Sequence, residues 1–275
     1  MSRADGGGLL VSELVTMFRR RRTIALLAVL GAVPILIAVA VKLSTSDVRP
    51  GDGPAFLDRV SQNGLFVAVT ALVVSIPLFL PLAIGVVAGD TIAGEAGLGT
   101  LRYLLIAPVG RVRLLLVKFA SSIAFCLAAT IVVAVSGAII GAILFPVGRV
   151  TLLSGSTVSP ANALGRAALI AGYVTLSLLG MTAIGLFVST LTEVPVGAMA
   201  AVVVLAIASQ ILDSIPQVSW IHPWLFSHEW LGFADFMRDP ISWTSTQRDA
   251  LLQLGYIAVF GALAYSRFTT KDVLS

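Results

Sequence analysis

LFVAVTALVVSIPLFLPLAIGVVAG, residues 65–89, is a run of 25 residues without Asp, Glu, Lys or Arg. A helix rises about 1.5 Å per residue, so a run of this length can cross the ~30 Å hydrocarbon core of a bilayer. The two prolines inside it, Pro77 and Pro81, are tolerated in lipid because neighbouring helices can satisfy the backbone groups that they free. The stretch therefore predicts a transmembrane segment.

The rest of the chain repeats this pattern. Of the 275 residues, 57% are hydrophobic and 12% are charged, and the mean hydropathy is +0.99. Such a composition is typical of a multi-pass membrane protein. No segment outside the apolar runs is long enough to bury a separate core, so residues 1–275 are predicted to form one all-α membrane domain with a bundle at 23–267. The six predicted spans are residues 23–41, 65–89, 119–145, 167–191, 194–212 and 250–265.

Basic residues near the span ends predict the orientation. The two sides of the membrane hold eleven and seven Lys and Arg, and the richer side is cytoplasmic under the positive-inside rule. This puts both termini in the cytoplasm and the chain in the plasma membrane. The net charge of +4 comes from these clusters, so no nucleic-acid partner is expected. The cytoplasmic set is Arg3, Arg19, Arg20, Arg21, Arg22, Arg102, Arg111, Arg113, Lys118, Arg267 and Lys271.

The N-terminal segment predicts an interfacial helix at residues 8–22. Its apolar residues would lie on the inner leaflet, and they are Leu10, Leu14, Met17 and Phe18. Basic side chains would hold the chain at anionic headgroups, and the expected inner-leaflet anchors are Arg19, Arg20, Arg21, Arg22 and Lys118. The alternatives are a frayed basic tail and a signal peptide cleaved near AVA at residues 38–40.

The outer segment, residues 213–249, holds all four tryptophans and both histidines. Tryptophan prefers the headgroup layer, so this segment is predicted to lie in the outer interface. The residues expected to anchor it or to form an outer gate are Trp220, Trp224, Trp230 and Trp243. His222, His228 and Glu229 do not have the spacing of a known metal motif, so no metal site is expected.

Catalytic and energy-coupling motifs are missing from the sequence. The chain has no GxxxxGK[ST] phosphate-binding loop, and LLSGST at residues 152–157 lacks the second glycine and the glutamine of an LSGGQ signature. By the predicted boundaries no Asp, Glu, His or Arg lies mid-span, where proton- or ion-coupled carriers usually keep one. We expect no catalytic residue and no enzyme activity. Energy for uphill transport would come from another polypeptide.

The most polar internal segment is GEAGLGTLRYLLIAPVGRVR, residues 94–113, between the second and third predicted spans. A short helix is predicted at about residues 100–107, because Thr100 can cap it and Pro108 ends it. Glu95 would place negative charge near its start. The leucines that share one face of this helix are Leu101, Leu104 and Leu105.

At these residues the chain resembles the type-2 ATP-binding cassette (ABC) transporter permeases. The first cytoplasmic loop of that family has an acidic residue, Gly-Thr-Leu, a leucine-rich helix, Pro-Val-x-Arg and then a lysine that opens the next span. The matching positions are Glu95, Gly99, Thr100, Leu101, Pro108, Val109, Arg111 and Lys118. The six-span topology and the amphipathic leader match too, so the resemblance covers the whole chain, although its specific motifs lie in this loop.

In that family the loop helix is a coupling helix that seats in a groove of a separate ATPase subunit. The resemblance implies ATPase contacts at Glu95, Gly99, Thr100, Leu101, Arg102, Leu104, Leu105, Pro108 and Arg111. Many members carry a glutamate after Gly-Thr-Leu, where this chain has Arg102, and a second acidic residue, where it has Gly94 or Ala96. Charge pairing with an ATPase therefore departs from the family pattern. The alternative is an amphipathic loop helix that only lies on the inner leaflet.

The resemblance implies a permease subunit of an ABC exporter without an ATPase of its own. It would pair with a second permease, identical or different, and with cytoplasmic ABC ATPase subunits that bind ATP and Mg, while contacting membrane lipid. The alternative is a non-transporting membrane scaffold or assembly factor, and an intramembrane enzyme or secondary carrier is the remaining class. Gln210, near the outer end of the fifth span, is the most polar candidate for contact with a hydrophobic or amphiphilic solute.

Overall fold

The computed structural model describes residues 6–47, 63–99 and 110–270, which are mostly helical. The described chain has six helical segments long and apolar enough to cross a membrane. The protein is therefore an all-α, multi-pass membrane protein, and each of these segments overlaps one predicted span. They are Arg21–Leu43, Phe79–Gly97, Arg111–Leu144, Pro160–Leu191, Pro195–Asp213 and Thr244–Thr270.

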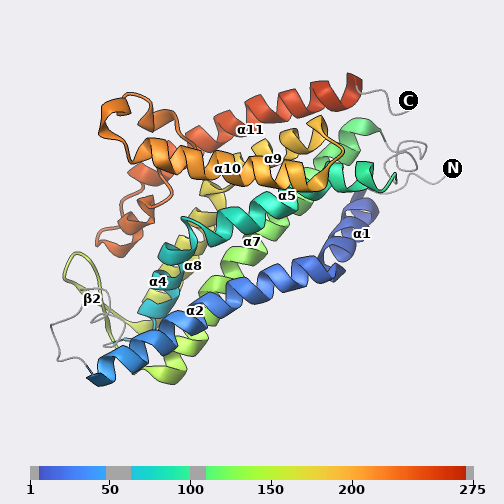
Figure 1. The fold of residues 1–275 in the computed structure, drawn as a ribbon. Coiled ribbons are helices and arrows are strands. Elements are labelled where there is room, and N and C mark those ends of the chain that lie inside the picture. Colours follow the sequence, from blue (N-terminus) through green and yellow to red (C-terminus); the bar gives the residue numbers. More distant parts are fainter. Residues whose placement is uncertain (1–5, 48–62, 100–109, 271–275) are drawn as a thin grey trace.

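Figure 1 shows the order of the elements along the bundle. The first three spans and their leader comprise α1 (Gly6–Arg19), α2 (Arg21–Asp47), α4 (Phe66–Ser75), α5 (Phe79–Gly97) and α7 (Arg111–Leu144). The last three comprise α8 (Pro160–Ser177), α9 (Leu179–Leu191), α10 (Pro195–Asp213) and α11 (Thr244–Thr270). Strands β1 (Val150–Thr151) and β2 (Thr157–Val158) pair antiparallel between α7 and α8. Three short 3-10 helices lie between α10 and α11, at η1 (Pro216–Val218), η2 (His222–Trp224) and η3 (Gly232–Met237).

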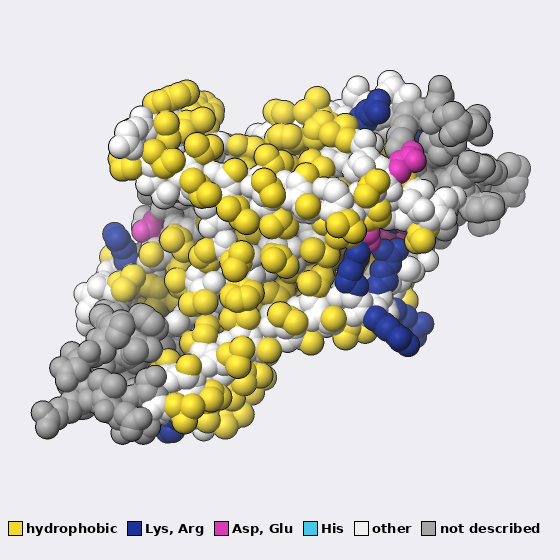
Figure 2. All heavy atoms as spheres, viewed as in Figure 1, with side chains coloured by type: hydrophobic (Ala, Val, Ile, Leu, Met, Phe, Trp, Pro, Cys, Tyr) yellow, Lys and Arg dark blue, Asp and Glu magenta, His cyan; other side chains and the backbone are white. Residues whose placement is uncertain are grey.

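The two ends of the bundle carry different structures. Helix α1 and the last turns of α11 lie at one end, here called the terminal end, whereas β2 lies at the opposite end, here called the loop end (Figure 1). On the face drawn in Figure 2, hydrophobic side chains cover the middle, and charged side chains lie toward the ends. This distribution matches an apolar belt in the bilayer with polar ends in the headgroup layers.

Two helices at the terminal end extend beyond the predicted spans. Helix α5 continues past residue 89 to Gly97, and α7 begins at Arg111, ahead of the predicted residue 119. The prediction ended both spans at polar residues. However, Asp90, Glu95 and Lys118 are buried within the two helices. They are tolerated there because each pairs with a side chain of opposite charge.

The second span is interrupted between α4 and α5 by its prolines. Proline has no backbone N–H, so Pro77 cannot donate the helical hydrogen bond to the residue one turn before it. For the same reason, Pro81 cannot donate to the carbonyl of Pro77. Gln210 of α10 supplies the missing donor, because its Nε2 lies 2.7 Å from the Pro77 oxygen. Gln210, which was predicted to contact a solute, thus forms a hydrogen bond at the interruption of the second span.

The fourth span is interrupted at Leu178, between α8 and α9. Thr175 and Ser177 donate their hydroxyl protons to carbonyls one turn back, at Ala171 and Tyr173 respectively. Such bonds compete with the regular helix pattern and bend a helix. The two interrupted spans pack side by side through α5 and α9.

Close backbone contacts join α4 to α7. A Cβ on Gly137 of α7 would lie 2.7 Å from the Ala68 Cα, and one on Gly141 would clash with the Gly64 backbone. The two glycines have the GxxxG spacing that allows such approach. They are used for contact within the chain.

Helix α1 turns its apolar face toward the bundle. Met17 is 7% exposed and belongs to the main core, and Leu14 and Phe18 pack against the same core. The helix therefore exists where the sequence predicts one, but protein covers the face that was expected on the inner leaflet. Its exposed large apolar side chains are Val11 and Val15.

Candidate functional site

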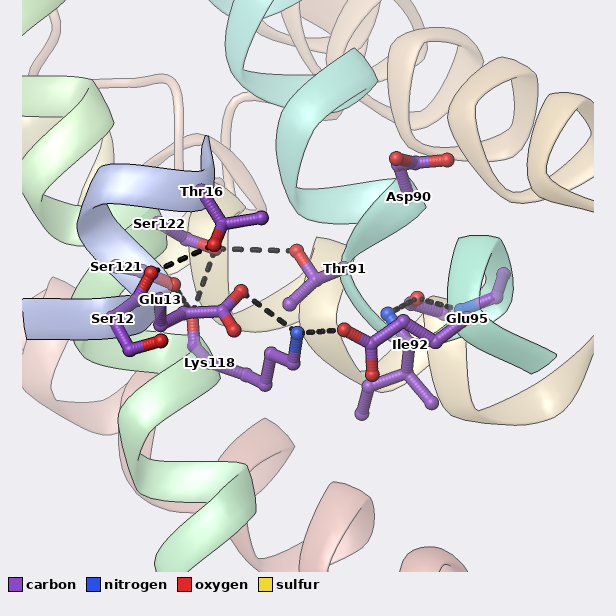
Figure 3. A network of polar contacts seen from close by, with 12 residues as sticks. Ser12, Glu13, Thr16, Asp90, Thr91, Ile92, Glu95, Lys118, Ser121 and Ser122 are labelled. Carbon is purple, nitrogen blue, oxygen red and sulfur yellow. Dashed lines mark hydrogen bonds and ion pairs between the residues drawn. The ribbon is translucent and has the colours of Figure 1, made fainter. Parts of the chain in front are cut away.

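A network of ion pairs lies at the terminal end, between α1, the start of α2, α5 and α7, and Figure 3 shows the part of it around Lys118. It contains three basic and three acidic side chains, which are Glu13, Arg20, Arg22, Asp90, Glu95 and Lys118. With all six ionised, their formal charges sum to zero. The positive and negative charges of this terminal-end network therefore balance one another.

Lys118 of α7 is the centre of the terminal-end network. Its side chain is 2% exposed, and its Nζ donates to Glu13 Oε1 of α1 at 2.7 Å and to Glu95 Oε1 of α5. Figure 3 shows the ammonium between the two carboxylates. An isolated ammonium buried here would cost several kcal/mol, and the paired carboxylates offset that cost. One side chain thus joins three helices.

Asp90 of α5 pairs with the arginine run that links α1 to α2. Its Oδ2 accepts hydrogen bonds from Arg22 and, at 3.3 Å, from Arg20. The carboxylate is nearly buried, whereas the Arg20 and Arg22 side chains are 41% and 39% exposed. Solvent screens exposed charges, so these pairs contribute less than those of Lys118. They hold the α1–α2 turn against α5.

A small polar cavity lies beside these ion pairs. Hydroxyl groups contribute to its lining, and they belong to Thr23, Thr91, Ser121 and Ser122. Thr91 Oγ1 and Ser122 Oγ lie 3.3 Å apart, and Ser121 and Ser122 both donate to the Lys118 carbonyl. The hydroxyls thus extend the polar layer across α2, α5 and α7.

Helix α5 also connects the terminal-end network to α9 and α10. The Ser189 hydroxyl of α9 accepts hydrogen bonds at 2.8 Å from the backbone N–H groups of Ile92 and Ala93. A Cβ on Gly97 would meet the Glu193 carbonyl at 2.8 Å, in the turn between α9 and α10. The last turns of α5 are therefore ion-paired to the α1–α2 turn, α2 and α7, and they pack closely against α9 and the α9–α10 turn.

Most of the predicted ATPase contacts lie outside the described residues. These are Thr100, Leu101, Arg102, Leu104, Leu105 and Pro108. Gly99 is described, and its φ of 69° is one that glycine adopts without strain as the chain leaves α5. Arg111 donates to the carbonyls of Phe268 and Thr269 and so secures the end of α11. Glu95, another of the predicted contacts, is buried against Lys118.

The predicted inner-leaflet anchors fall into three groups. Arg19 and Arg21 are exposed. Arg20 and Arg22 are partly exposed, and each forms an ion pair with Asp90. Lys118 is buried in the terminal-end network, so the expectation that it reaches the headgroups is corrected. The reason is that two acidic side chains from other helices supply its partners.

The four tryptophans at the loop end also differ from one another. Trp220, Trp224 and Trp243 are 75%, 70% and 50% exposed. Trp230 is buried, and its Nε1 donates to the Ser177 carbonyl at 3.0 Å. Three of the four side chains are thus available to a bilayer interface, and the fourth packs inside the protein.

The sequence analysis missed two groups of buried charges. The partners of Lys118 lie 105 and 23 residues away in the chain, so spacing alone could not pair them. The available signal was an acidic residue, Asp90, directly after an uncharged run and on the same predicted side as the arginines. Asp249 was assigned to the outer segment, but α11 begins at Thr244 and includes Asp249 in its second turn, where the side chain is buried.

The six candidate spans define a helical, multi-pass membrane protein. The chain belongs to the family described as "Protein of unknown function (DUF2705)", whose model matches residues 34–274. No curated protein matches the chain. The family description assigns no activity, so the resemblance to ABC permeases stays a prediction.

Proposed function

We propose that the chain is the membrane-spanning permease subunit of an ABC exporter, driven by ATP hydrolysis on a separate cytoplasmic ATPase subunit. The observation that carries the proposal is the position of the loop that resembles the family's coupling loop. Residues 100–109 follow α5 in the chain, after Leu98 and Gly99, and α5 is a helix whose charges pair with both the α1–α2 segment and α7. A force applied to this loop would therefore act on a helix that is ion-paired to both of these neighbours.

The terminal-end network would transmit such a force from α5 to the neighbouring helices. Helix α5 cannot shift alone, because Asp90 would leave Arg20 and Arg22 and Glu95 would leave Lys118. Separating a buried pair costs several kcal/mol, so the helices that share the pairs would move together. Contacts of α5 with α9 and α10 would extend the motion to the other half of the bundle. Domain movements of this kind can rearrange a path between two permease subunits.

The proposal also fixes orientation and partners. Both termini and the terminal end face the cytoplasm at the plasma membrane, with Arg19 and Arg21 toward inner-leaflet headgroups. The amphipathic α1 lies near that leaflet, and the exposed tryptophans of the loop end lie in the outer interface. ATP and Mg bind to the partner ATPase, the chain itself is not an enzyme, and a second permease completes the transporter.

Co-purification tests the partner. The tagged wild-type chain, extracted in mild detergent, is expected to retain a cytoplasmic ABC ATPase identified by mass spectrometry. Leu104→Glu, on the predicted docking face, should release it, because a charge replaces an apolar contact. Ser154→Glu, at an exposed position of the loop end, is the matched control and should retain it. Equal recovery with Leu104→Glu would argue against docking at this loop.

Cysteine labelling tests the orientation. Cys126 is buried, so the native chain gives a low background with a membrane-impermeant maleimide. Ser154→Cys is expected to react in intact cells, and Thr100→Cys only after permeabilisation. The reverse pattern would invert the topology and exclude a cytoplasmic partner for residues 100–109.

A further inference from the structure

Asp249 is a buried carboxyl that the terminal-end network does not use. It lies in the second turn of α11, and it is 0% exposed. Its neighbours are the end of α8 at Ser177 and the next turn of α11 at Gln253. The carboxyl therefore lies beside the interruption of the fourth span.

Two neutral side chains bond to this carboxyl. Gln253 Nε2 donates to Asp249 Oδ1 at 2.8 Å. Ser177 Oγ is hydrogen-bonded to Asp249 Oδ2. Neither group carries charge, so these bonds alone leave an ionised Asp249 without a counter-charge.

The proton count around Ser177 is informative. Its hydroxyl has one proton, yet Oγ lies 3.0 Å from the Tyr173 carbonyl oxygen and also in hydrogen-bond contact with Asp249 Oδ2. A carbonyl and an ionised carboxylate both act only as acceptors, so an ionised Asp249 would have to share the single Ser177 proton with the Tyr173 carbonyl. A proton on Oδ2 gives each of the two contacts a proton of its own. The Asp249 O–H then donates to Ser177, and the Ser177 O–H donates to Tyr173.

No basic side chain compensates for Asp249 within the described ranges 6–47, 63–99 and 110–270. On α8 the nearby titratable group is Tyr173, whose hydroxyl donates to the Glu229 carbonyl at 2.5 Å. From the segment between α10 and α11, Glu229 acts on Asp249, and its charge has the same sign as an ionised Asp249. Helix α9 has no titratable side chain, and Arg248 of α11 is exposed. An uncompensated carboxylate buried in a membrane helix costs several kcal/mol.

We propose that Asp249 is a proton-binding site, whose carboxyl holds its proton while residues 226–230 are packed over α8 and α11. The inference is independent of the proposed ATPase partner. It follows from the hydrogen-bond count, the complete burial of the carboxyl and the lack of a basic partner.

The site is linked to the loop-end segment through its own hydrogen bonds. Gln253 Nε2 donates to the Phe226 carbonyl at 3.1 Å, and Gln253 Oε1 accepts from the Gly180 N–H at 3.0 Å. Trp230 Nε1 donates to the carbonyl of Ser177, the residue that bonds to Asp249. A carboxylate at this position needs water, and separation of residues 226–230 from the helices would open both of its partners to solvent. Loss of the proton at higher pH therefore favours the separated state.

Infrared spectroscopy of the purified full chain in lipid films tests the proton directly. At neutral pH the wild type is expected to show a carbonyl stretching band of a protonated carboxyl, because exposed carboxyls are ionised. Asp249→Asn should remove this band. Glu193→Gln, which removes an exposed carboxyl, should leave it intact. A wild type without such a band, or a band unchanged by Asp249→Asn, would overturn the proposal.

Hydrogen exchange tests the link to the loop end. Exchange of the amides of residues 226–230 is expected to rise with pH more steeply than intrinsic exchange in the wild type. In Asp249→Asn the excess should vanish, because the amide can donate to Ser177 and accept from Gln253 as the protonated acid does. Protection that depends on sodium concentration, with no infrared band, would instead assign a metal cation to the site and refute a proton.

Discussion

The terminal-end network and the Asp249 site solve the same problem in different ways. Both place acidic side chains in helices that are apolar enough to span a membrane. At the terminal end, Lys118 and two arginines supply opposite charge. At Asp249 the described partners are a hydroxyl and an amide. The first arrangement suits a permanently charged joint between helices, and the second suits a group that gains and loses a proton.

This difference sets how each region responds to substitution. Removing one member of an ion pair leaves its partner charged and buried, which is strongly destabilising. Replacing a protonated acid by its amide leaves every neighbour with a suitable partner. The two regions should therefore differ most under changes that remove charge while preserving shape.

The largest effect is expected for Lys118→Met. The change keeps the length of the side chain but leaves Glu13 and Glu95 without their buried partner, which should lower the free energy of unfolding by about 3–5 kcal/mol. Denaturant titration of the purified protein in detergent measures it. Arg248→Met, at an exposed arginine of α11, is the control and should change little. Equal stability of the two variants would remove the central role given to Lys118.

A smaller effect is expected for Asp90→Asn. The two arginines that it pairs with are partly exposed, so the loss should be about 1–2 kcal/mol. Screening by salt should shrink the difference from the wild type, whereas the loss in Lys118→Met should change less with salt because that pair is buried. Stability measured at low and high salt would separate the two cases. A loss in Asp90→Asn that is insensitive to salt would mean that this pair is as shielded as the Lys118 pairs.

Gln210→Leu should cost about 1 kcal/mol. The substitution removes the donor to the Pro77 carbonyl, which Pro81 cannot replace. Gln247→Leu, at an exposed glutamine of α11, provides the matched control for the change in polarity. If both variants unfold at the same denaturant concentration, the contact does not stabilise the interrupted span.

The smallest effect is expected for Asp249→Asn, within about 0.5 kcal/mol of the wild type at neutral pH. The amide reproduces the bonds of the protonated acid to Ser177 and Gln253. Unfolding titrations at neutral and alkaline pH measure the change, and the wild type should lose more stability at alkaline pH than the variant does. A loss at neutral pH as large as that of Lys118→Met would indicate an essential carboxylate.

Fold class and span number were predictable because they depend on local properties. The uncharged run at residues 65–89 is long enough to cross a bilayer whatever surrounds it, and the other five spans follow by the same rule. The prolines in this run made an interruption possible, but its form depends on Gln210, more than a hundred residues away. The local sequence pattern therefore predicted the positions of the spans, whereas tertiary contacts determine where the helices within them are interrupted.

The charged network was not predictable to the same degree. The sequence marked the arginine run, Glu95 and Lys118 as polar residues at span ends, which is where apolar length stops. Their pairing requires α1 to fold back along α7, and no spacing rule encodes that geometry. The face of α1 that packs on the bundle and a face that lies on lipid have the same sequence pattern, so only the structure distinguishes them.

The most direct test of the proposed function is the rate of ATP hydrolysis by the co-purified ATPase after reconstitution in lipid vesicles. We expect the wild-type chain to change this rate relative to the ATPase alone and Leu104→Glu to abolish the change. Ser154→Glu should behave as the wild type. An ATPase whose turnover is the same with and without the chain would contradict the permease assignment and favour a non-transporting scaffold.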